Sequence, residues 1–591
     1  MATLSPASPQ TNTGIRDRFD LRSALPFLSW LANYRREDLL GDLLAGIIVA
    51  IMLVPQAMAY AMLAGLPPEV GLYASISPLI IYGFLGTSRT LAVGPVAIVS
   101  LMVATGVGAI ATAGTGDYIA LAVVLALMVG IIQVAMGLMR VGFLVNFLSH
   151  PVLSGFTNAA AIYIGLSQVK HVLGVQMPRQ EHTYETLFYL VGHFGESNLA
   201  VLGLGFGAIA VLVYFKTAFA RHLARFGLRE ALLVPITKTG PLVVVVVGSL
   251  LVAVFGLNQS AQVPIVGDVP AGLPTIAAPD LQISDIQVLL PIALTISIVG
   301  FMESITVAKS LASRRRQKVN ANQELVALGT ANLGAAFTGG YPVTGGLARS
   351  MVNFSAGANT GLASIITALL IGITVIFFTP LFYFLPNAVL GAIILVAVAN
   401  LIDFQPLAHA WHYDHTDAIS FVVTFIGVLA LGIEYGILLG AASALLIHLW
   451  RTSRPHIAIV GRVGETEHFR NILRYETRIH PEILAIRVDE SLYFANAQYL
   501  ENTLLNTIAE HKEVEHLVLV CSGVNYIDTS ALEALEKLID QLHSSGVNFY
   551  LAEVKGPVMD RLQRIGFIDH LGIERVFLNA HAAIQALAHN N

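Results

Sequence analysis

The chain has 591 residues, of which 55% are hydrophobic and only 12% charged, and its mean hydropathy is +0.71. Soluble proteins carry about 25% charged residues, so this composition excludes a soluble protein and predicts an integral membrane protein. The formal net charge of −5 says little, because the charges lie in loops and in the tail, and we expect no nucleic-acid partner. Cys521, the single cysteine, excludes an intramolecular disulfide framework.

The N-terminal segment begins with a polar stretch that does not resemble a signal peptide. The following stretch from Ile15 to Arg36 is amphipathic, which favours a helix lying at the cytoplasmic membrane surface. We therefore assign residues 1–38 to a cytoplasmic N-terminal segment. Its basic residues are Arg16, Arg18, Arg22, Arg35 and Arg36.

Residues 39–450 form a run of apolar segments without a soluble insertion. A spanning helix needs about 20 residues, and we expect about fourteen transmembrane segments, of which the third (94–110) and the tenth (346–358) are short. Basic residues cluster after even-numbered segments, which places both termini in the cytoplasm. The sequence thus predicts an α-helical polytopic protein of the cell inner (plasma) membrane.

The third segment contains the dipeptide Gly94-Pro95 inside an otherwise apolar stretch. Gly followed by Pro is typical of a helix start, so we expect a helix that begins at membrane depth. Its first amides would be an anion site, because they lack intrahelical partners and carry a partial positive charge. A Pro-kinked but continuous helix is the alternative.

An internal repeat is indicated by two pairs of landmarks. Gln56 and Glu303 lie 247 residues apart in similar apolar stretches, and Gly94 and Gly345 lie 251 residues apart before short segments. Seven segments is an odd number, so the second repeat (287–450) would be inverted relative to the first (39–256). The two short helices would then point their N-termini at each other near the bilayer midplane. Coincidence among apolar segments is the alternative.

The composition after Trp450 becomes that of a soluble α/β domain, predicted for residues 470–591 after a linker at 451–469. Three apolar runs are typical of buried strands, and helical patterns separate them. We expect strands at 483–488, 516–521 and 547–552, and helices at 496–511, 530–544 and 557–565.

Two groups of motifs resemble a known family. The first group comprises residues 54–61 (VPQAMAYA), 63–68 (LAGLPP), 71–73 (GLY), 86–89 (GTSR) and Gly94-Pro95. It resembles the sulfate permease superfamily, which includes the solute carrier 26 anion transporters. The tail motif at 525–532 (NYIDTSAL) resembles a STAS domain, the module shared with bacterial anti-sigma factor antagonists.

The resemblance implies a 7+7 inverted repeat in which a mobile core domain works against a gate domain, commonly in a homodimer. It also implies a cytosolic STAS-binding protein as a candidate partner. A residue with the place of Ser530 is phosphorylated in anti-sigma factor antagonists, so Ser530 is a candidate regulatory site. Capping of a helix by the same motif is the alternative.

Glu303 lies in an apolar segment, where a carboxylate is costly and is by default a functional candidate. Burial would make it able to take up a proton. In the resembled family an acid at this place is associated with coupling to H⁺ or Na⁺; sodium-coupled members carry a hydroxyl where this chain has Val307, which favours protons. A structural ion pair with Arg349 is the alternative.

The predicted substrate site combines Gln56, whose amide could donate to an anion, with the starts of the two short helices. Helix-to-helix hydrogen bonding is the alternative for Gln56. In several relatives a Ser stands at the place of Ala348, so selectivity should not be copied from them. The substrate-binding candidates are Gln56, Tyr60, Val96, Ala97, Leu347, Ala348, Arg349 and Ser350, and the helix-break residues are Gly94, Pro95, Gly345 and Gly346.

The sequence contains no Walker-type loop, HExxH or nucleophile elbow, so we expect neither an enzyme nor a cofactor or metal site. The leading hypothesis is a secondary active transporter of a small inorganic oxyanion, most simply sulfate:H⁺ symport by alternating access. The alternatives are a Na⁺-coupled bicarbonate or dicarboxylate transporter, a passive anion channel, and a membrane-tethered signalling scaffold.

Overall fold

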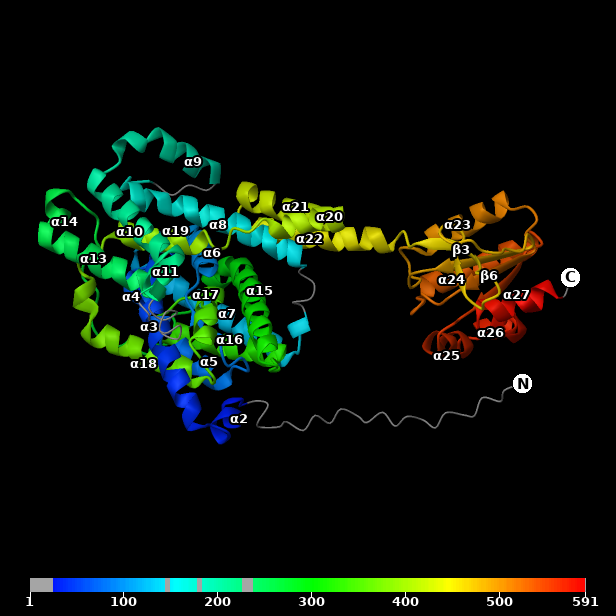
Figure 1. Ribbon diagram of the computed structural model, residues 1–591, viewed down its shortest axis with the longest axis horizontal. Helices are drawn as coiled ribbons and strands as arrows, with labels where there is room; N and C mark the ends of the chain where they lie inside the picture. Colours follow the sequence, from blue (N-terminus) through cyan, green and yellow to red (C-terminus); the bar gives the residue numbers. More distant parts are fainter. Residues whose placement is uncertain (1–24, 144–148, 178–182, 226–236, 590–591) are drawn as a thin grey trace. The chain divides into compact units, whose positions relative to one another are not determined.

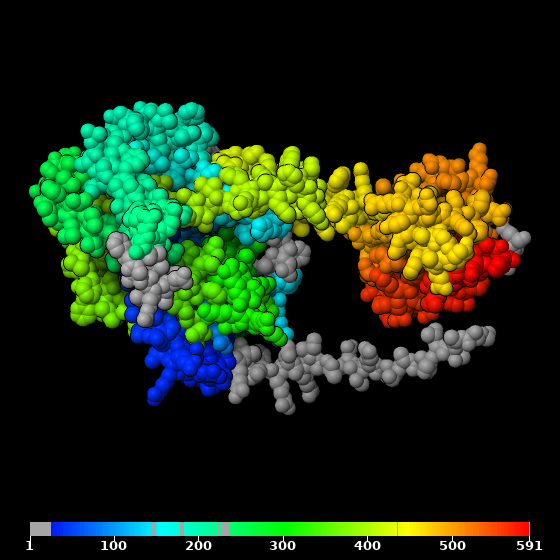
Figure 2. All heavy atoms as spheres, viewed as in Figure 1, coloured from blue at the N-terminus to red at the C-terminus, as the bar shows by residue number. Residues whose placement is uncertain are grey.

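The computed structural model describes residues 25–143, 149–177, 183–225 and 237–589. The chain divides into two units, Met1–Ala442 and Ser443–Asn591. In Figure 2 the residues of the second unit, coloured from yellow to red, form a body of their own. Each unit is described by itself.

The first half of the membrane unit is almost entirely helical (Figure 1). Its elements are α2 (Phe27–Ala32), α3 (Arg36–Leu63), α4 (Pro68–Tyr73), α5 (Ser77–Leu85), β1 (Val93–Gly94), α6 (Ala97–Gly108), α7 (Gly116–Leu138), α8 (His150–Leu173), α9 (Thr183–Gly192), η2 (Phe194–Glu196), α10 (Leu199–Thr217), α11 (Phe219–Arg225), α13 (Gly240–Phe255) and α14 (Leu257–Ser260).

The second half follows the same pattern of helices with one short strand. Its elements are α15 (Ile283–Arg314), α16 (Ala321–Phe337), β2 (Thr344–Gly345), α17 (Leu347–Ser355), α18 (Leu362–Phe377), η3 (Thr379–Phe382), α19 (Asn387–Val398), α20 (Gln405–Tyr413), α21 (His415–Leu431) and α22 (Ile433–Thr452).

Helices occupy every expected apolar segment, but their lengths differ widely. Six helical segments in the described residues are long and apolar enough to cross a bilayer, and five shorter apolar helices of 10–17 residues accompany them. The architecture is that of a polytopic membrane protein, although length and composition do not establish the count of fourteen.

The N-terminal segment differs from its expected form. Arg16, Arg18 and Arg22 lie outside the described residues, and the described part holds only the six-residue helix α2 before α3 begins at Arg36. Phe27 of α2 packs edge-on against Phe84 of α5, with ring centroids 5.3 Å apart. Within the described residues 25–36, the predicted helix is therefore interrupted between Ala32 and Arg36.

The two halves of the membrane unit are related as an inverted repeat, and corresponding helices pack in corresponding ways. α3 packs against α17 and α18, and its counterpart α15 packs against α6 and α7. β1 and β2 pair antiparallel, which is the arrangement that opposed copies require. We call α3–α7 and α15–α18 the core group, and α8, α10, α13, α19 and α21 the gate group.

Two fully buried carboxylates fix loops of the core group. Glu324 of α16 accepts hydrogen bonds from the N–H groups of Thr87 (2.7 Å) and Ser88 (3.0 Å) and from the Tyr82 hydroxyl (2.7 Å). Asp42 of α3 accepts from the N–H groups of Asn359 (2.7 Å) and Thr360 (3.0 Å). These bonds tie the loop before β1 to α16 and the loop before α18 to α3.

The tail is a six-stranded sheet of order β4-β3-β5-β6-β7-β8 with helices on both faces. Leucines of α23 and α24 cover one face, and Ala583 and Leu587 of α27 cover the other. The elements are β3 (Ile457–Arg462), β4 (Phe469–Asn471), β5 (Ile483–Val488), α23 (Ala497–Glu510), β6 (His516–Val520), α24 (Thr529–Ser544), β7 (Asn548–Ala552), α25 (Gly556–Arg564), α26 (Phe567–Leu571), η4 (Ile573–Arg575), β8 (Val576–Phe577) and α27 (Ala580–Ala588).

The tail begins earlier in the chain than the sequence predicts. β3 pairs antiparallel with β5 inside the stretch 451–469 that we assigned to a linker. Its alternating burial, with Ala458 and Val460 inside, shows a strand with one face on the core. The α22 helix continues to Thr452, so only residues 453–456 separate the last membrane helix from the sheet.

Candidate functional site

The centre of the core group is the crossing of β1 and β2, from which two half-helices depart. Val93 lies opposite Gly345 and Gly94 opposite Thr344. Gly94 has a φ of 153°, which an L side chain rarely adopts, so the turn into Pro95 requires a glycine. α6 and α17 begin within three residues of this crossing.

The first turns of both half-helices present amides without helical partners. The first helical bond of α6 runs from Ser100 N to Val96 O, and that of α17 from Ser350 N to Gly346 O. The N–H groups of residues 97–99 and 347–349 therefore have no carbonyl acceptor within their own helix. Together with the helix dipoles they provide two positive ends that favour an anion.

Arg349 connects the two half-helices. Its side chain is only 2% exposed, and its Nη1 donates a hydrogen bond to the carbonyl of Pro95, just before α6. Its Nε and Nη2 are buried and have no partner in the part of the chain that the structure describes. A buried charged donor without a partner is costly, so these two N–H groups are available to a ligand.

Glu303 is held in place by its helix neighbour. The Ser304 hydroxyl accepts a hydrogen bond from Gly345 N (2.8 Å) and pairs with the Thr344 hydroxyl (2.6 Å), which joins α15 to β2. Glu303 Oε2 is buried without a partner, and among the described residues no ion pair joins Glu303 to Arg349. The structural ion pair considered as an alternative is therefore absent from this arrangement.

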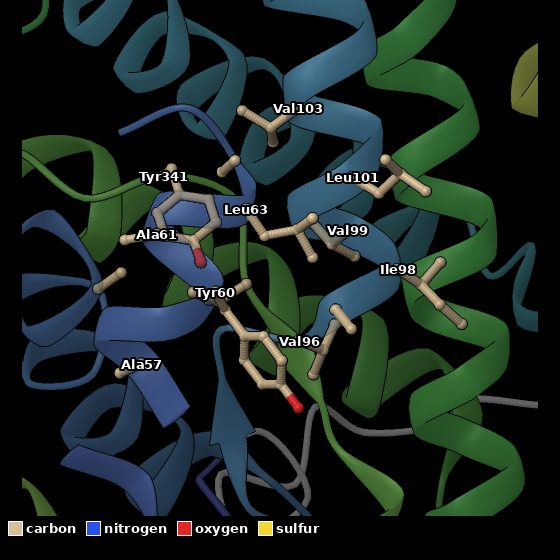
Figure 3. Close-up of a cluster of buried hydrophobic side chains, with 14 of the residues drawn as sticks. Ala57, Tyr60, Ala61, Leu63, Val96, Ile98, Val99, Leu101, Val103 and Tyr341 are labelled. Atoms are coloured by element: carbon tan, nitrogen blue, oxygen red, sulfur yellow. The ribbon is translucent and has the colours of Figure 1, made fainter. Parts of the chain in front are cut away.

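These groups line a cavity of about 750 Å³ between the core group and the gate group. Figure 3 shows two members of its wall, Tyr60 on α3 and Val96 at the start of α6. The gate side is formed by residues of α10, α13 and α19. The predicted site residues that line the cavity are Gln56, Tyr60, Val96, Ala97, Glu303, Gly346, Leu347, Ala348 and Arg349.

The remaining predicted site residues lie behind the cavity wall. Ser350 is fully buried, where its hydroxyl accepts from Ala92 N (2.9 Å) and donates to Gly346 O (2.7 Å). It is absent from the lining, as are Gly94, Pro95 and Gly345. Ser350 thus holds β1 against α17, a positioning role that differs from the direct contact we expected.

Gln56 has the environment of a ligand-binding group. Its side chain is 7% exposed and lines the cavity, and no hydrogen bond of its amide is found within the described chain. α3 passes Pro55 without interruption, so Gln56 lies on a continuous helix. The amide can therefore donate to a bound anion.

The sequence reasoning missed several polar residues of the cavity, among them Lys216, Lys238 and Asn400. The Lys216 ammonium donates a hydrogen bond to the Asn400 side chain, which joins the end of α10 to the chain just after α19. Both lysines belong to the basic residues that follow an even-numbered segment, and the sequence pattern used them only to orient the chain in the membrane. Their proximity to the site depends on helix packing, which the sequence pattern does not show.

Arg315 also has a more specific role than the basic cluster 314–316 suggests. Its guanidinium donates to the carbonyls of Phe354 (3.1 Å) and Ala358 (2.5 Å) at the C-terminal end of α17 and lies over the Phe354 ring. A cation at a helix C-terminus is favourable, and this one links the end of α15 to the end of α17.

In the tail, Ser530 is exposed in the first turn of α24. Asp528 caps that helix, and its Oδ1 accepts from Ala531 N at 2.8 Å. The serine is therefore accessible to a modifying enzyme, while the capping alternative is realised by its neighbour.

Comparisons with known proteins agree with this architecture. The family model described as the sulfate permease family matches residues 39–424, and the STAS domain model matches residues 474–583. The chain is 36% identical over 573 residues to "Sulfate transporter 4.1, chloroplastic" of Arabidopsis thaliana, covering 95% of this chain and 82% of the relative. It is 34% identical over 556 residues to a protein of Mycobacterium tuberculosis named as a probable sulfate transporter, covering 94% and 96%.

Solved structures show the same fold. A structure of murine Solute Carrier 26 family member A9 in the inward-facing state matches with a TM-score of 0.90 at 26% identity, covering 98% of this chain and 96% of that chain. The transmembrane domain of a cyanobacterial bicarbonate transporter matches with a TM-score of 0.58 at 22% identity, covering 70% and 98%.

Proposed function

Because the chain belongs to the sulfate permease family and carries a STAS domain, we propose that it is a secondary active transporter of a small inorganic oxyanion, with sulfate as the first candidate. The observation that carries the proposal is the cavity in which two half-helix N-termini meet the unpartnered donors of Arg349. Backbone N–H groups and a guanidinium are the donors that oxyanions prefer.

The coupling ion is a proton taken up by Glu303. Its carboxyl shares the cavity with the anion site, and its Oε2 lacks a partner. Neutralising this carboxyl removes the repulsion between it and an incoming anion, so that the anion and proton bind together. Na⁺ is the alternative coupling ion, and the chain needs no organic cofactor or metal.

Transport proceeds by alternating access of the core group against the gate group. The cavity is bounded by both groups, and its wall includes Lys216 and Lys238, which the positive-inside rule assigns to the cytoplasmic side. The described arrangement is accordingly the inward-open one. We expect both termini in the cytoplasm, a plasma-membrane location and a homodimer.

Uptake of labelled sulfate into proteoliposomes, with and without an inward proton gradient, tests the proposal. The wild type should accumulate sulfate with the gradient, and Glu303→Gln should bind sulfate but no longer respond to pH. Asp285→Asn, a half-buried acid at the start of α15 that does not line the cavity, is the matched control and should behave like the wild type. If the wild type takes up sulfate equally well with and without the proton gradient, the proposed coupling to protons is wrong. If its uptake requires Na⁺, the coupling ion is Na⁺ instead.

The other classes predict different outcomes in the same vesicles. A passive channel would conduct far above carrier rates, and Glu303→Gln would leave its flux intact. A signalling scaffold would move no anion, and deleting residues after Arg454 would abolish its output. A competition panel of sulfate, bicarbonate and dicarboxylates against labelled sulfate identifies the preferred anion.

A further inference from the structure

A large apolar groove of the membrane unit lies on a surface that the anion site does not use. It has a volume of about 860 Å³, within the range of sites that hold a drug-sized ligand. Residues of α3, α13, α18 and η3 line it; buried residues of α3 form its floor, and more exposed residues of α13 and α18 form its walls. The floor residues Ala50 and Val54 are buried, whereas the wall residues Val246 and Ile373 are 47% and 46% exposed.

The lining of this groove is suited to a hydrocarbon. None of its lining residues in the described chain is charged, and its only hydroxyls are those of Ser249 and Thr374. The Thr374 hydroxyl already donates to Leu370 O at 2.9 Å, so it offers no free donor. An apolar cavity of this kind stays dry, and a void would forfeit the dispersion contacts of its walls.

We infer that the groove binds an acyl chain of a bilayer phospholipid. All three helices that form it are apolar membrane helices, and the walls open outward, where hydrocarbon is the surrounding solvent. A peptide segment would bring many backbone N–H and C=O groups, whereas the buried Ser249 hydroxyl is the one polar side-chain group of this lining that lacks a partner among the described residues. A linear hydrocarbon needs no such partners and fills a groove flanked by two helices.

The position of the groove gives the bound chain a consequence for transport. α3 and α18 belong to the core group and α13 to the gate group, so the occupant contacts both. Any movement of one group against the other changes the groove, and the acyl chain therefore has different contacts in the two states. A ligand that binds two states with different free energies shifts the equilibrium between them toward the state that it binds more tightly. This step rests on the proposed alternating access; the binding itself does not.

Two neighbouring valines of α13 provide a matched pair of variants. Val246 lines the groove and Val247 does not, yet they are 47% and 48% exposed. Val246→Trp places an indole in the groove, and Val247→Trp places one on the lipid-facing surface beside it. Ile373→Trp, in the groove, and Ile376→Trp, outside it, repeat the comparison on α18 and serve if a Val246 variant fails to fold.

The experiment uses the full chain in phosphatidylcholine nanodiscs that contain a trace of phosphatidylcholine with a photoactivatable diazirine on one acyl chain. After illumination, mass spectrometry measures labelling of α13 and α18 peptides. We expect the labelling of Val246→Trp to be at least fivefold weaker than that of the wild type, and the labelling of Val247→Trp to stay within twofold of the wild type. Equal labelling of the two variants, or an unlabelled wild type because a second copy or protein covers the groove, overturns the proposal.

Sulfate uptake by the same variants tests the consequence separately. In Val246→Trp the indole stays in the groove in every state, so the maximal rate of sulfate uptake should fall at least fivefold. The sulfate concentration that gives half-maximal uptake should change by no more than twofold. Val247→Trp should transport sulfate at the wild-type rate. Unchanged turnover in Val246→Trp overturns the effect on transport. If no anion is transported by the wild type but the labelling difference persists, the proposed function fails and the acyl site stands.

Discussion

The guanidinium of Arg349, in the second repeat, donates a hydrogen bond to the carbonyl of Pro95, in the first. One side chain therefore both closes the junction between the half-helices and keeps two further N–H donors unpartnered beside the cavity. Gly346 makes room for it, because a Cβ there would lie 3.1 Å from its Nη2. The glycine that precedes α17 thus serves the approach of Arg349, whereas Gly94 serves the turn into Pro95.

Replacing Arg349 by lysine should separate the effect of charge from that of geometry. Lysine keeps the positive charge but lacks the planar arrangement of donors that holds both Pro95 and an oxyanion. A lost charged hydrogen bond corresponds to about 1.5–3 kcal/mol, so we expect sulfate to bind roughly 10- to 100-fold more weakly to Arg349→Lys. Isothermal titration of the detergent-solubilised protein with sulfate measures the change.

Arg314→Lys is the control for that substitution, because Arg314 is exposed at the end of α15, away from the cavity lining. Its sulfate affinity should equal that of the wild type. If Arg349→Lys binds as tightly as Arg314→Lys, the guanidinium has no direct part in anion recognition.

The loops before β1 and α18 should depend on the buried carboxylates that fix them. Glu324→Ala leaves the N–H groups of Thr87 and Ser88 and the Tyr82 hydroxyl without their acceptor. Unsatisfied buried donors cost free energy, and we expect a loss of about 2–5 kcal/mol of stability, with a lower thermal midpoint in detergent. Glu324→Gln, which retains an acceptor oxygen, should lose less.

Glu196→Ala provides the comparison for Glu324→Ala, since Glu196 is exposed in η2. Its thermal midpoint should match the wild type. Equal midpoints for the two alanine variants would show that the loop at 87–88 is held by other contacts.

The sequence predicted much of this organisation because the relevant signals are local. Gly94-Pro95 and Gly345-Gly346 interrupt apolar runs, so the half-helices could be located before any packing was known. The strands at 483–488 and 516–520 are predominantly apolar runs and were found in the same way. Such signals reside in the backbone chemistry of a few neighbouring residues.

The rest depends on tertiary contacts that a local pattern does not contain. β1 and β2 have two residues each, too few for a periodic signal, and their paired residues, Val93 with Gly345 and Gly94 with Thr344, lie far apart in the chain. Ser350 follows Arg349 by one residue, yet the helix turns its hydroxyl toward Ala92 and away from the cavity. Polar residues flank β3 in the sequence, so its stretch was assigned to a linker, and only its pairing with β5 shows that it is a strand of the sheet.

The single cysteine should be unreactive in the folded tail. Burial, with the nearby charge of Glu553 as a second cause, raises the pKa of the Cys521 thiol to about 12, so almost no thiolate is present at neutral pH. Because the thiolate is the nucleophile, we expect maleimide to react more than about a hundredfold more slowly than with a free cysteine. Mass spectrometry of intact protein follows the reaction, and full labelling after urea unfolding is the control. Rapid labelling of the folded chain would mean that Cys521 is accessible.

The acid stability of the tail should depend on Asp489 at the end of β5. Burial works against its ionisation, but hydrogen bonds from Arg487 (2.6 Å) and His456 (2.8 Å) outweigh this effect and hold the pKa of Asp489 below its usual value of 3.8. A lowered pKa in the folded state stabilises the fold above the usual pKa, and this stabilisation is lost as the pH falls through the folded-state value.

Asp489→Asn removes the ionisable group while keeping an acceptor of similar shape. We expect the wild type to unfold at a higher urea concentration than this variant above about pH 4, and the difference to shrink as the pH falls below it. Circular dichroism of the full chain in detergent at a series of pH values measures the two midpoints. A difference between wild type and Asp489→Asn that is constant with pH would assign the effect to packing, because only an ionisable carboxyl can link stability to proton uptake.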